Sequence, residues 1–145
     1  MPSINFLSRI IILLLIATGI LNIDHFAHAQ EKAEMIKIGE SENDLKADFS
    51  IMPSEIKVKK ETIVIWVNFI NGPEINIEFS NPDAVIAATK DAKGFYMDEA
   101  NGVFSAKYLP FIATASIRFI KSGEYVFSVK SQDGEKSATG KVIVK

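Results

Sequence analysis

The sequence predicts an all-β domain, a sandwich of about seven or eight short strands with one short helix in its longest connection. Three observations support this prediction. From Ala47 onward, apolar and polar residues alternate as they do in half-buried strands. Turn residues separate these stretches at short intervals. The chain has no cysteine, so its fold depends on a hydrophobic core rather than on disulfides.

Residues 1–29 have the pattern of a secretory signal peptide. Arg9 supplies a positive charge, residues 10–23 are almost entirely apolar, and Ala27-His28-Ala29 is a small-x-small cleavage pattern. The alternative is an uncleaved membrane anchor, but a spanning helix needs about 20 apolar residues and this stretch is shorter. We therefore expect cleavage after Ala29, a periplasmic or secreted protein, and no membrane insertion after cleavage.

Residues 30–46 are expected to form a charged lead-in to the main domain at residues 47–145. Within the lead-in, Met35, Ile36 and Ile38 suggest either a short first strand or a mobile segment. The formal net charge of the chain is −2, which gives no electrostatic footprint for nucleic acid.

The strands of the main domain follow from their alternation, in order along the chain. Residues 62–69 are nearly all β-branched or aromatic, which predicts a central strand covered on both faces, with Trp66 in the core. The other predicted strands lie around Phe49 and Ile51, at residues 55–59, and at residues 74–80, 114–120, 124–130 and 138–145.

Asn81-Pro82-Asp83 has the residues of a helix start: an N-cap, a proline at the first position and an acid in the first turn. We expect a helix over residues 84–93, with Gly94 as its stop. Residues 95–110 are predicted to be irregular, with a turn at Asn101-Gly102.

In this order and spacing, the strands resemble the cupredoxin family, whose fold is a Greek-key β-sandwich. The resemblance covers residues 49–145. It rests on Pro53 with the alternating residues 54–58, a hydrophobic strand ending in Asn68, the Ile75–Phe79 stretch, Gly123-Glu124-Tyr125-Val126-Phe127, and residues 140–144.

The resemblance also places the four blue-copper ligands of the family, and all four are replaced here. The two histidine positions fall at Ile75 and Gln132, the cysteine position at Val129, and the axial methionine position at Ala138. A blue-copper site needs two imidazoles and a thiolate. His25 and His28 both precede the expected cleavage site, and the chain has no cysteine. The processed chain therefore has neither an imidazole nor a thiolate. We expect Ile75, Val129 and Ala138 to form an apolar plug instead.

A finer resemblance is to the iron-uptake-associated (EfeO-type) cupredoxin-like domains. It is carried by residues 71–80, 122–127 and 138–144. It implies a periplasmic accessory module for iron or copper handling, with a membrane permease or another envelope protein as partner.

Without imidazole or thiolate, a metal would need carboxylate or thioether ligands. The candidate carboxylates are Glu74, Glu78, Asp133 and Glu135, and the alternative is that they are ordinary surface acids. Met35, Met52 and Met97 are the candidate Cu(I) ligands. The alternative is that they only fill space in the core or on the surface.

The aromatic residues of residues 95–111 have two interpretations as well. They either pack this connection onto the sandwich or present a partner surface. They are Phe95, Tyr96, Phe104, Tyr108 and Phe111.

No catalytic motif is recognisable, and a Ser-His-Asp triad is impossible in the processed chain, which has no histidine. We therefore expect no enzyme. The expected function is an exported accessory module in periplasmic iron or copper handling, with no cofactor that the sequence makes certain. The alternative is a metal-free structural or protein-interaction domain of the cell envelope.

Overall fold

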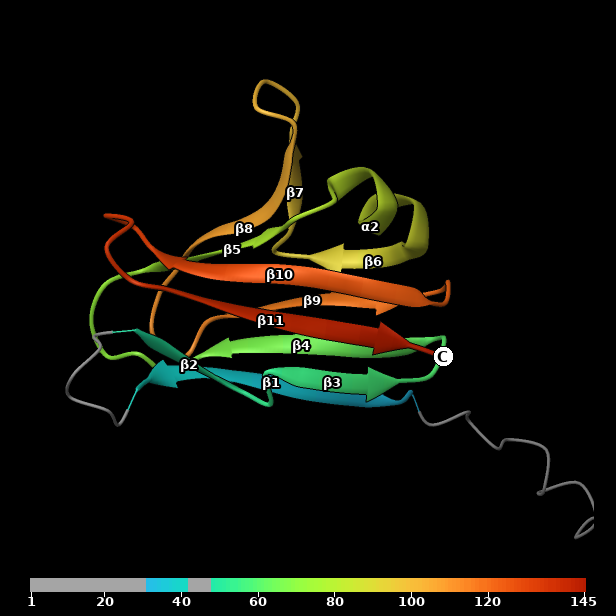
Figure 1. Cartoon of the computed structure of the whole chain (residues 1–145), viewed down its shortest axis with the longest axis horizontal. Coiled ribbons are helices and arrows are strands. Elements are labelled where there is room, and N and C mark those ends of the chain that lie inside the picture. Colours follow the sequence, from blue (N-terminus) through green and yellow to red (C-terminus); the bar gives the residue numbers. More distant parts are fainter. Residues whose placement is uncertain (1–30, 42–47) are drawn as a thin grey trace, which may run out of the picture. The chain divides into compact units, whose positions relative to one another are not determined.

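The computed structural model describes residues 31–41 and 48–145, whose strands form two sheets packed as a sandwich (Figure 1). The predicted signal peptide and both histidines lie outside these residues. The unit from Glu31 to Lys145 contains the whole described core. The predicted all-β fold is confirmed, with eleven strands among the described residues instead of the expected seven or eight.

One sheet has five strands in the order β2-β1-β4-β9-β6. Their bounds are Phe49–Met52 (β2), Ala33–Glu40 (β1), Thr62–Asn68 (β4), Thr114–Phe119 (β9) and Thr89–Lys93 (β6). β1 is parallel to β4, with Ile38 opposite Asn68, and antiparallel to β2. For residues 35–38, where the sequence suggested either a short first strand or a mobile segment, the structure therefore has a strand.

The other sheet has six strands in the order β3-β11-β10-β5-β8-β7. Their bounds are Glu55–Val58 (β3), Ser137–Val144 (β11), Gly123–Ser131 (β10), Ile75–Phe79 (β5), Val103–Leu109 (β8) and Tyr96–Asp98 (β7). The predicted alternation on β5 and β10 is confirmed. Its apolar residues, Ile75, Ile77, Phe79, Tyr125, Phe127 and Val129, are all buried between the sheets.

Trp66 is at the centre of the core, as predicted. Its side chain is fully buried, and Phe79, Phe95 and Phe127 meet it edge-on with ring centroids 5.9, 5.3 and 5.5 Å away. Such edge-to-face pairs stabilise a core beyond the area that they bury. On the opposite face of β4, Ile63 and Ile65 are only half-buried, so that face is covered in part, not fully as expected.

The Phe127 ring of β10 packs over β11 at Gly140. The two residues are opposite each other in the sheet, and a Cβ on Gly140 would overlap Cζ of Phe127. Because no real Cβ approaches another atom so closely, the ring occupies the space that a side chain at this position would fill.

The helix α2 (Pro82–Ala88) begins where predicted but ends early. Asn81 Oδ1 accepts a hydrogen bond from the Ala84 backbone N–H at 3.2 Å, as an N-cap does. The predicted extension to Lys93 is wrong, because Thr89 turns to an extended backbone and begins β6. The Thr89 hydroxyl donates to the Val85 carbonyl at 2.7 Å and so closes the last turn.

The prediction that residues 95–110 are irregular is also wrong, because they contain β7 and β8. The turn at Asn101-Gly102 is confirmed, and Gly102 has a φ of +62°. Asp98 holds this hairpin, since its carboxylate accepts from Lys107 Nζ at 3.1 Å and from Asn101 Nδ2 at 2.9 Å. In Figure 1 the hairpin projects at the top of the molecule.

Among residues 31–41 and 48–145, no helix is long and apolar enough to cross a membrane.

Candidate functional site

The candidate site lies at the end of the sandwich where β4 and β8 end and β5 begins. Figure 1 shows the β4–β5 and β10–β11 connections together at this end, on the left. Asn68, the last residue of β4, is fully buried there. Its side-chain Nδ2 donates to the Leu109 carbonyl at 2.9 Å, and its Oδ1 accepts from the Ile70 backbone N–H at 2.8 Å.

The Asn68 backbone is bonded to the β8–β9 connection. Its carbonyl accepts from the Ile112 N–H at 2.7 Å, and its N–H donates to the Ala113 carbonyl at 3.1 Å. Next to it, the Phe69 N–H donates to the Ile38 carbonyl at 2.7 Å. Each hydrogen-bonding group of Asn68 named here has a partner, so the residue fastens the β4–β5 and β8–β9 connections to each other.

Two residues at this end have a backbone conformation that side chains rarely adopt. Tyr108 has a φ of +57° and Ile112 a φ of +66°. For a β-branched residue such as Ile112, a positive φ is a true outlier, and such conformations persist only where the surroundings enforce them. Here the Tyr108 N–H donates to Asn76 Oδ1 at 2.9 Å, and the Ile112 N–H is held by Asn68.

Four large apolar side chains beside Asn68 point into solvent, and we call them the apolar end patch. Phe69 is 45% exposed, Tyr108 56%, Phe111 45% and Ile112 57%. The sequence has no charged residue at positions 68–73 or 108–117. The two segments that carry the patch are therefore uncharged, whereas the nearby β10–β11 connection has exposed Asp133 and Glu135 and the six-stranded sheet carries Lys and Glu side chains in salt bridges.

The five aromatic residues predicted to pack or to present a partner surface divide into buried and exposed side chains. Phe95 and Phe104 are buried in the core and stack with ring centroids 5.6 Å apart. Tyr96, Tyr108 and Phe111 are exposed. Sequence reasoning missed Phe69 and Ile112, although the lack of charge in their two segments was a usable signal.

The four positions that the resemblance assigns to copper ligands lie at the same end of the sandwich as this patch. Ile75 and Val129 are fully buried, Ala138 is half-buried against the core, and Gln132 is exposed. Val129 is opposite Ala138 on β11 and opposite Ile77 on β5, and Ile75 begins β5 opposite Ser131. Three neighbouring strands thus turn Ile75, Val129 and Ala138 toward the core, and the apolar plug itself stays a prediction.

The four candidate carboxylates have other partners or stand apart. Glu78 forms an ion pair with Lys130 at 2.7 Å, and Asp133 accepts from Ser131 Oγ at 2.5 Å and from the Glu135 N–H at 3.0 Å. The hydrogen bond from Ser131 and that from the Glu135 backbone lower the pKa of Asp133. Glu74 lies outside β5 and Glu135 is exposed.

Within residues 31–41 and 48–145, no three histidine, cysteine, aspartate or glutamate residues are grouped closely enough to hold a metal ion. The candidate thioethers are also distributed, since Met35 and Met52 lie in the five-stranded sheet and Met97 on the outer edge of the six-stranded sheet. In this part of the chain, the candidate metal ligands therefore either bind other protein groups or lie on separate elements.

No protein-family model matches the chain, and no curated protein does either. Solved structures that resemble it include mutants of amicyanin. One in its Cu(I) form is 18% identical, with 78% of this chain and 82% of the other covered and a TM-score of 0.46. A reduced mutant is 17% identical, with 82% and 88% covered and a TM-score of 0.47. The two sheets, with the strand orders given above, form the all-β, cupredoxin-like sandwich that the sequence predicts.

Proposed function

We propose that this chain is an exported cupredoxin-like module without a type 1 copper site, and that it acts as a protein-interaction domain of the cell envelope. Its binding surface is the apolar end patch. The observation that carries the proposal is the exposure of Tyr108 near the end of β8 and of Phe69, Phe111 and Ile112 on the two connections that the buried Asn68 fastens together.

A preorganised patch lowers the free-energy cost of binding a partner. Binding costs about 0.5–1.5 kcal/mol for each flexible side chain that an interface immobilises. Aromatic residues lose little freedom, because they have two side-chain torsions, and they are enriched at interface centres. The positive φ values of Tyr108 and Ile112, each held by a hydrogen bond, indicate that the backbone beneath the patch is already fixed.

The partner is expected to present an apolar, uncharged surface. Charged side chains at an interface steer association and select complementary charges. Residues 68–73 and 108–117 offer none, so these two segments cannot select a partner by charge. An envelope protein or a membrane permease with an exposed apolar surface outside the bilayer fits this requirement.

The alternative function, iron or copper handling through bound metal, has less support. It would need the carboxylates of Glu78 and Asp133 to leave Lys130 and Ser131, respectively, and to come together. A module of the iron-uptake type that contacts a permease through the patch, without holding the metal itself, agrees with both the resemblance and the patch. We propose binding rather than catalysis, because the patch consists of Phe69, Tyr108, Phe111 and Ile112, which are suited to apolar contact.

Export is part of the proposal and rests on the pattern of residues 1–29. The intact mass of the protein recovered from the cell envelope tests it. We expect a chain that begins at Gln30, and a chain that retains residues 1–29 would contradict export with cleavage.

Crosslinking in cells tests the proposed binding surface. A photoreactive phenylalanine analogue in place of Phe111 is expected to give one adduct with an envelope protein. The same analogue in place of the exposed Lys57, on β3, is the matched control and is expected to give none. Adding Ile112→Asp should abolish the Phe111 adduct. No adduct from position 111, or equal adducts from positions 111 and 57, would contradict the proposal.

A further inference from the structure

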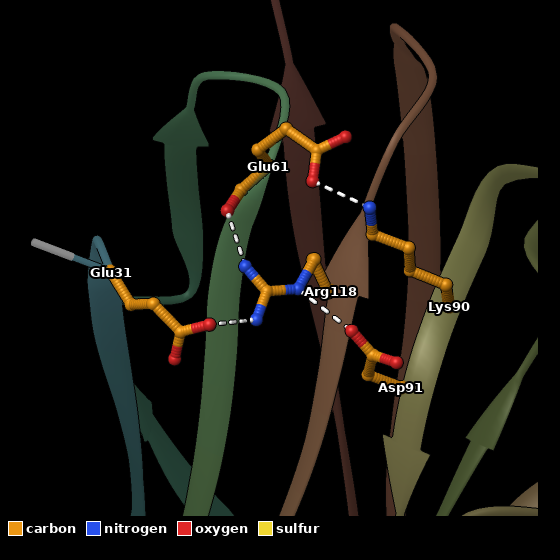
Figure 2. A network of polar contacts seen from close by, with 5 residues as sticks. All are labelled: Glu31, Glu61, Lys90, Asp91 and Arg118. Carbon is orange, nitrogen blue, oxygen red and sulfur yellow. Dashed lines mark hydrogen bonds and ion pairs between the residues drawn. The ribbon is translucent and has the colours of Figure 1, made fainter. Parts of the chain in front are cut away.

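A second polar cluster surrounds Arg118, near the end of β4 that is farthest from Asn68 (Figure 2). The Arg118 side chain is only 14% exposed. Its Nη2 meets Glu31 Oε1 at 2.5 Å, its Nε meets Asp91 Oδ2 at 3.0 Å, and its Nη1 donates to the Glu61 carbonyl at 3.3 Å. The guanidinium is thus fixed in place by three different segments of the chain.

A hollow of about 380 Å³ lies beside this guanidinium. It lies where β6 does not follow β9 regularly: Lys90 is opposite Arg118 and Lys93 opposite Ser116, and the register shifts between them. Asp91, inside the shift, has a φ of +53°. The hollow is lined by apolar Ile63 and Ala92 and by polar Ser116, Lys93, Asp91, Glu31 and Arg118.

The charges that line the hollow cancel only while Glu31 is present. Glu31 and Asp91 are each negative, and Lys93 and Arg118 are each positive, so the formal sum is zero. Lys93 forms no ion pair within residues 31–41 and 48–145. Without Glu31 the hollow has a formal charge of +1.

Glu31 differs from Asp91 in its place along the chain. Both side chains are more than half exposed, at 67% and 59%, but Glu31 precedes the first strand of the sheet whereas Asp91 lies within β6. Exposed ion pairs contribute little, so a competing anion can replace the partner that no strand holds. The guanidinium remains in position when Glu31 leaves, because Asp91 and the Glu61 carbonyl still hold it.

We propose that this hollow is a binding site for a small organic monocarboxylate, and that Glu31 is a built-in stand-in for the ligand carboxylate. A guanidinium fork matches a carboxylate geometrically, which a lone ammonium does not. The ligand carboxylate takes the place of Glu31 on Arg118 and neutralises the remaining charge of Lys93. A short apolar tail then rests on Ile63 and Ala92. The volume is at the lower end of the range for small-molecule pockets, which are about 300–1,000 Å³.

Titration with sodium butyrate, followed by amide NMR at constant ionic strength, tests the site in residues 30–145, which include the whole described core. In the wild type we expect saturable shifts at Ile63, Ala92 and Ser116. Glu31→Gln should tighten binding about two- to sixfold, because it removes the internal competitor. Absence of saturable shifts in Glu31→Gln would overturn the proposal.

Two further variants keep the test decisive. Glu34→Gln is the matched control, since Glu34 is the next acid along the chain, pairs with Lys32 and does not line the hollow. It should leave the affinity unchanged, and a gain equal to that of Glu31→Gln would refute the stand-in role. Lys93→Gln should weaken binding while leaving the contacts of Arg118 intact. Inorganic phosphate that binds as tightly as butyrate would overturn the assignment to a carboxylate.

Discussion

Asn68 donates a hydrogen bond from its side-chain amide to the carbonyl of Leu109, 41 residues further along the chain, at 2.9 Å. This bond is buried and joins the ends of two strands that belong to different sheets, β4 and β8. The apolar end patch therefore owes its shape to one polar residue beneath it. If the patch binds a partner, its preorganisation depends on that residue.

Replacing Asn68 by alanine should destabilise the protein strongly. The change leaves the Leu109 carbonyl and the Ile70 N–H buried without a partner, and each such group costs about 1–3 kcal/mol. We expect the free energy of unfolding to fall by about 2–5 kcal/mol in urea titrations. Asn76→Ala, which removes one exposed bond to the Tyr108 N–H, should cost about 1 kcal/mol. Equal costs for the two variants would contradict the role of Asn68.

The apolar plug predicts opposite outcomes for two valines of β10. Val129 is fully buried and Val126, on the opposite face of the same strand, is 38% exposed. Val129→Asp buries an unpaired carboxylate and should cost about 4 kcal/mol or more, or prevent folding. Val126→Asp should cost about 1 kcal/mol or less. Thermal melting distinguishes them, and a Val129→Asp protein as stable as the wild type would refute the plug. Ile75→Asp should behave as Val129→Asp does.

Gly140 and Gly39 form a matched pair for the packing of Phe127. Gly140→Ala places a methyl group against the Phe127 ring and should cost about 1–3 kcal/mol, the usual range for overpacking. Gly39, also in a strand, has no atom of another residue within 4 Å of the point where a Cβ would lie, its two chain neighbours aside. Gly39→Ala should therefore be neutral or stabilising by up to about 1 kcal/mol. Denaturation midpoints measure both, and a harmless Gly140→Ala would mean that the ring has room to move.

The β7–β8 hairpin should weaken in acid through Asp98. Hydrogen bonds from Asn101 and Lys107 lower the pKa of this carboxyl in the folded protein. A lowered folded-state pKa means that the stabilisation is present above the unfolded-state value, about 3.9, and is lost as the pH falls through the folded-state value. We expect the melting temperature to fall less between pH 6 and pH 2.5 in Asp98→Asn than in the wild type.

Glu34→Gln is the control for the acid experiment. Its carboxylate pairs with Lys32 at 3.6 Å at an exposed site, where ion pairs contribute little. This variant should show the acid dependence of the wild type. The explanation through Asp98 fails if Asp98→Asn and Glu34→Gln have the same pH profile.

Alternation predicted the strands that have one buried and one exposed face. Ile75, Ile77 and Phe79 on β5 are the clearest case, because every second residue faces the core. In β8 the consecutive residues Phe104, Ser105 and Ala106 are all buried, so no period of two was visible. β6 was missed for another reason: Thr89–Lys93 has little apolar character and is a strand because it pairs with β9.

The candidate sites divide along similar lines. The sequence placed Ile75 and Val129 in the core, since both are apolar members of alternating strands. It did not predict the cluster at Arg118, whose partners Glu31 and Asp91 lie 87 and 27 residues away along the chain. Contacts of this kind arise from the strand order, and no local pattern of residues encodes them.

We propose that this end of the sandwich acts through apolar protein contact and not through a metal, and thermal melting with added metal tests this most directly. A ligand that binds the native state must stabilise it. We expect micromolar Fe²⁺, Cu⁺, Cu²⁺ or Mn²⁺ to leave the melting temperature of residues 30–145 unchanged. A rise that is lost when Glu74→Gln and Glu78→Gln are combined would contradict the account and favour a carboxylate metal site.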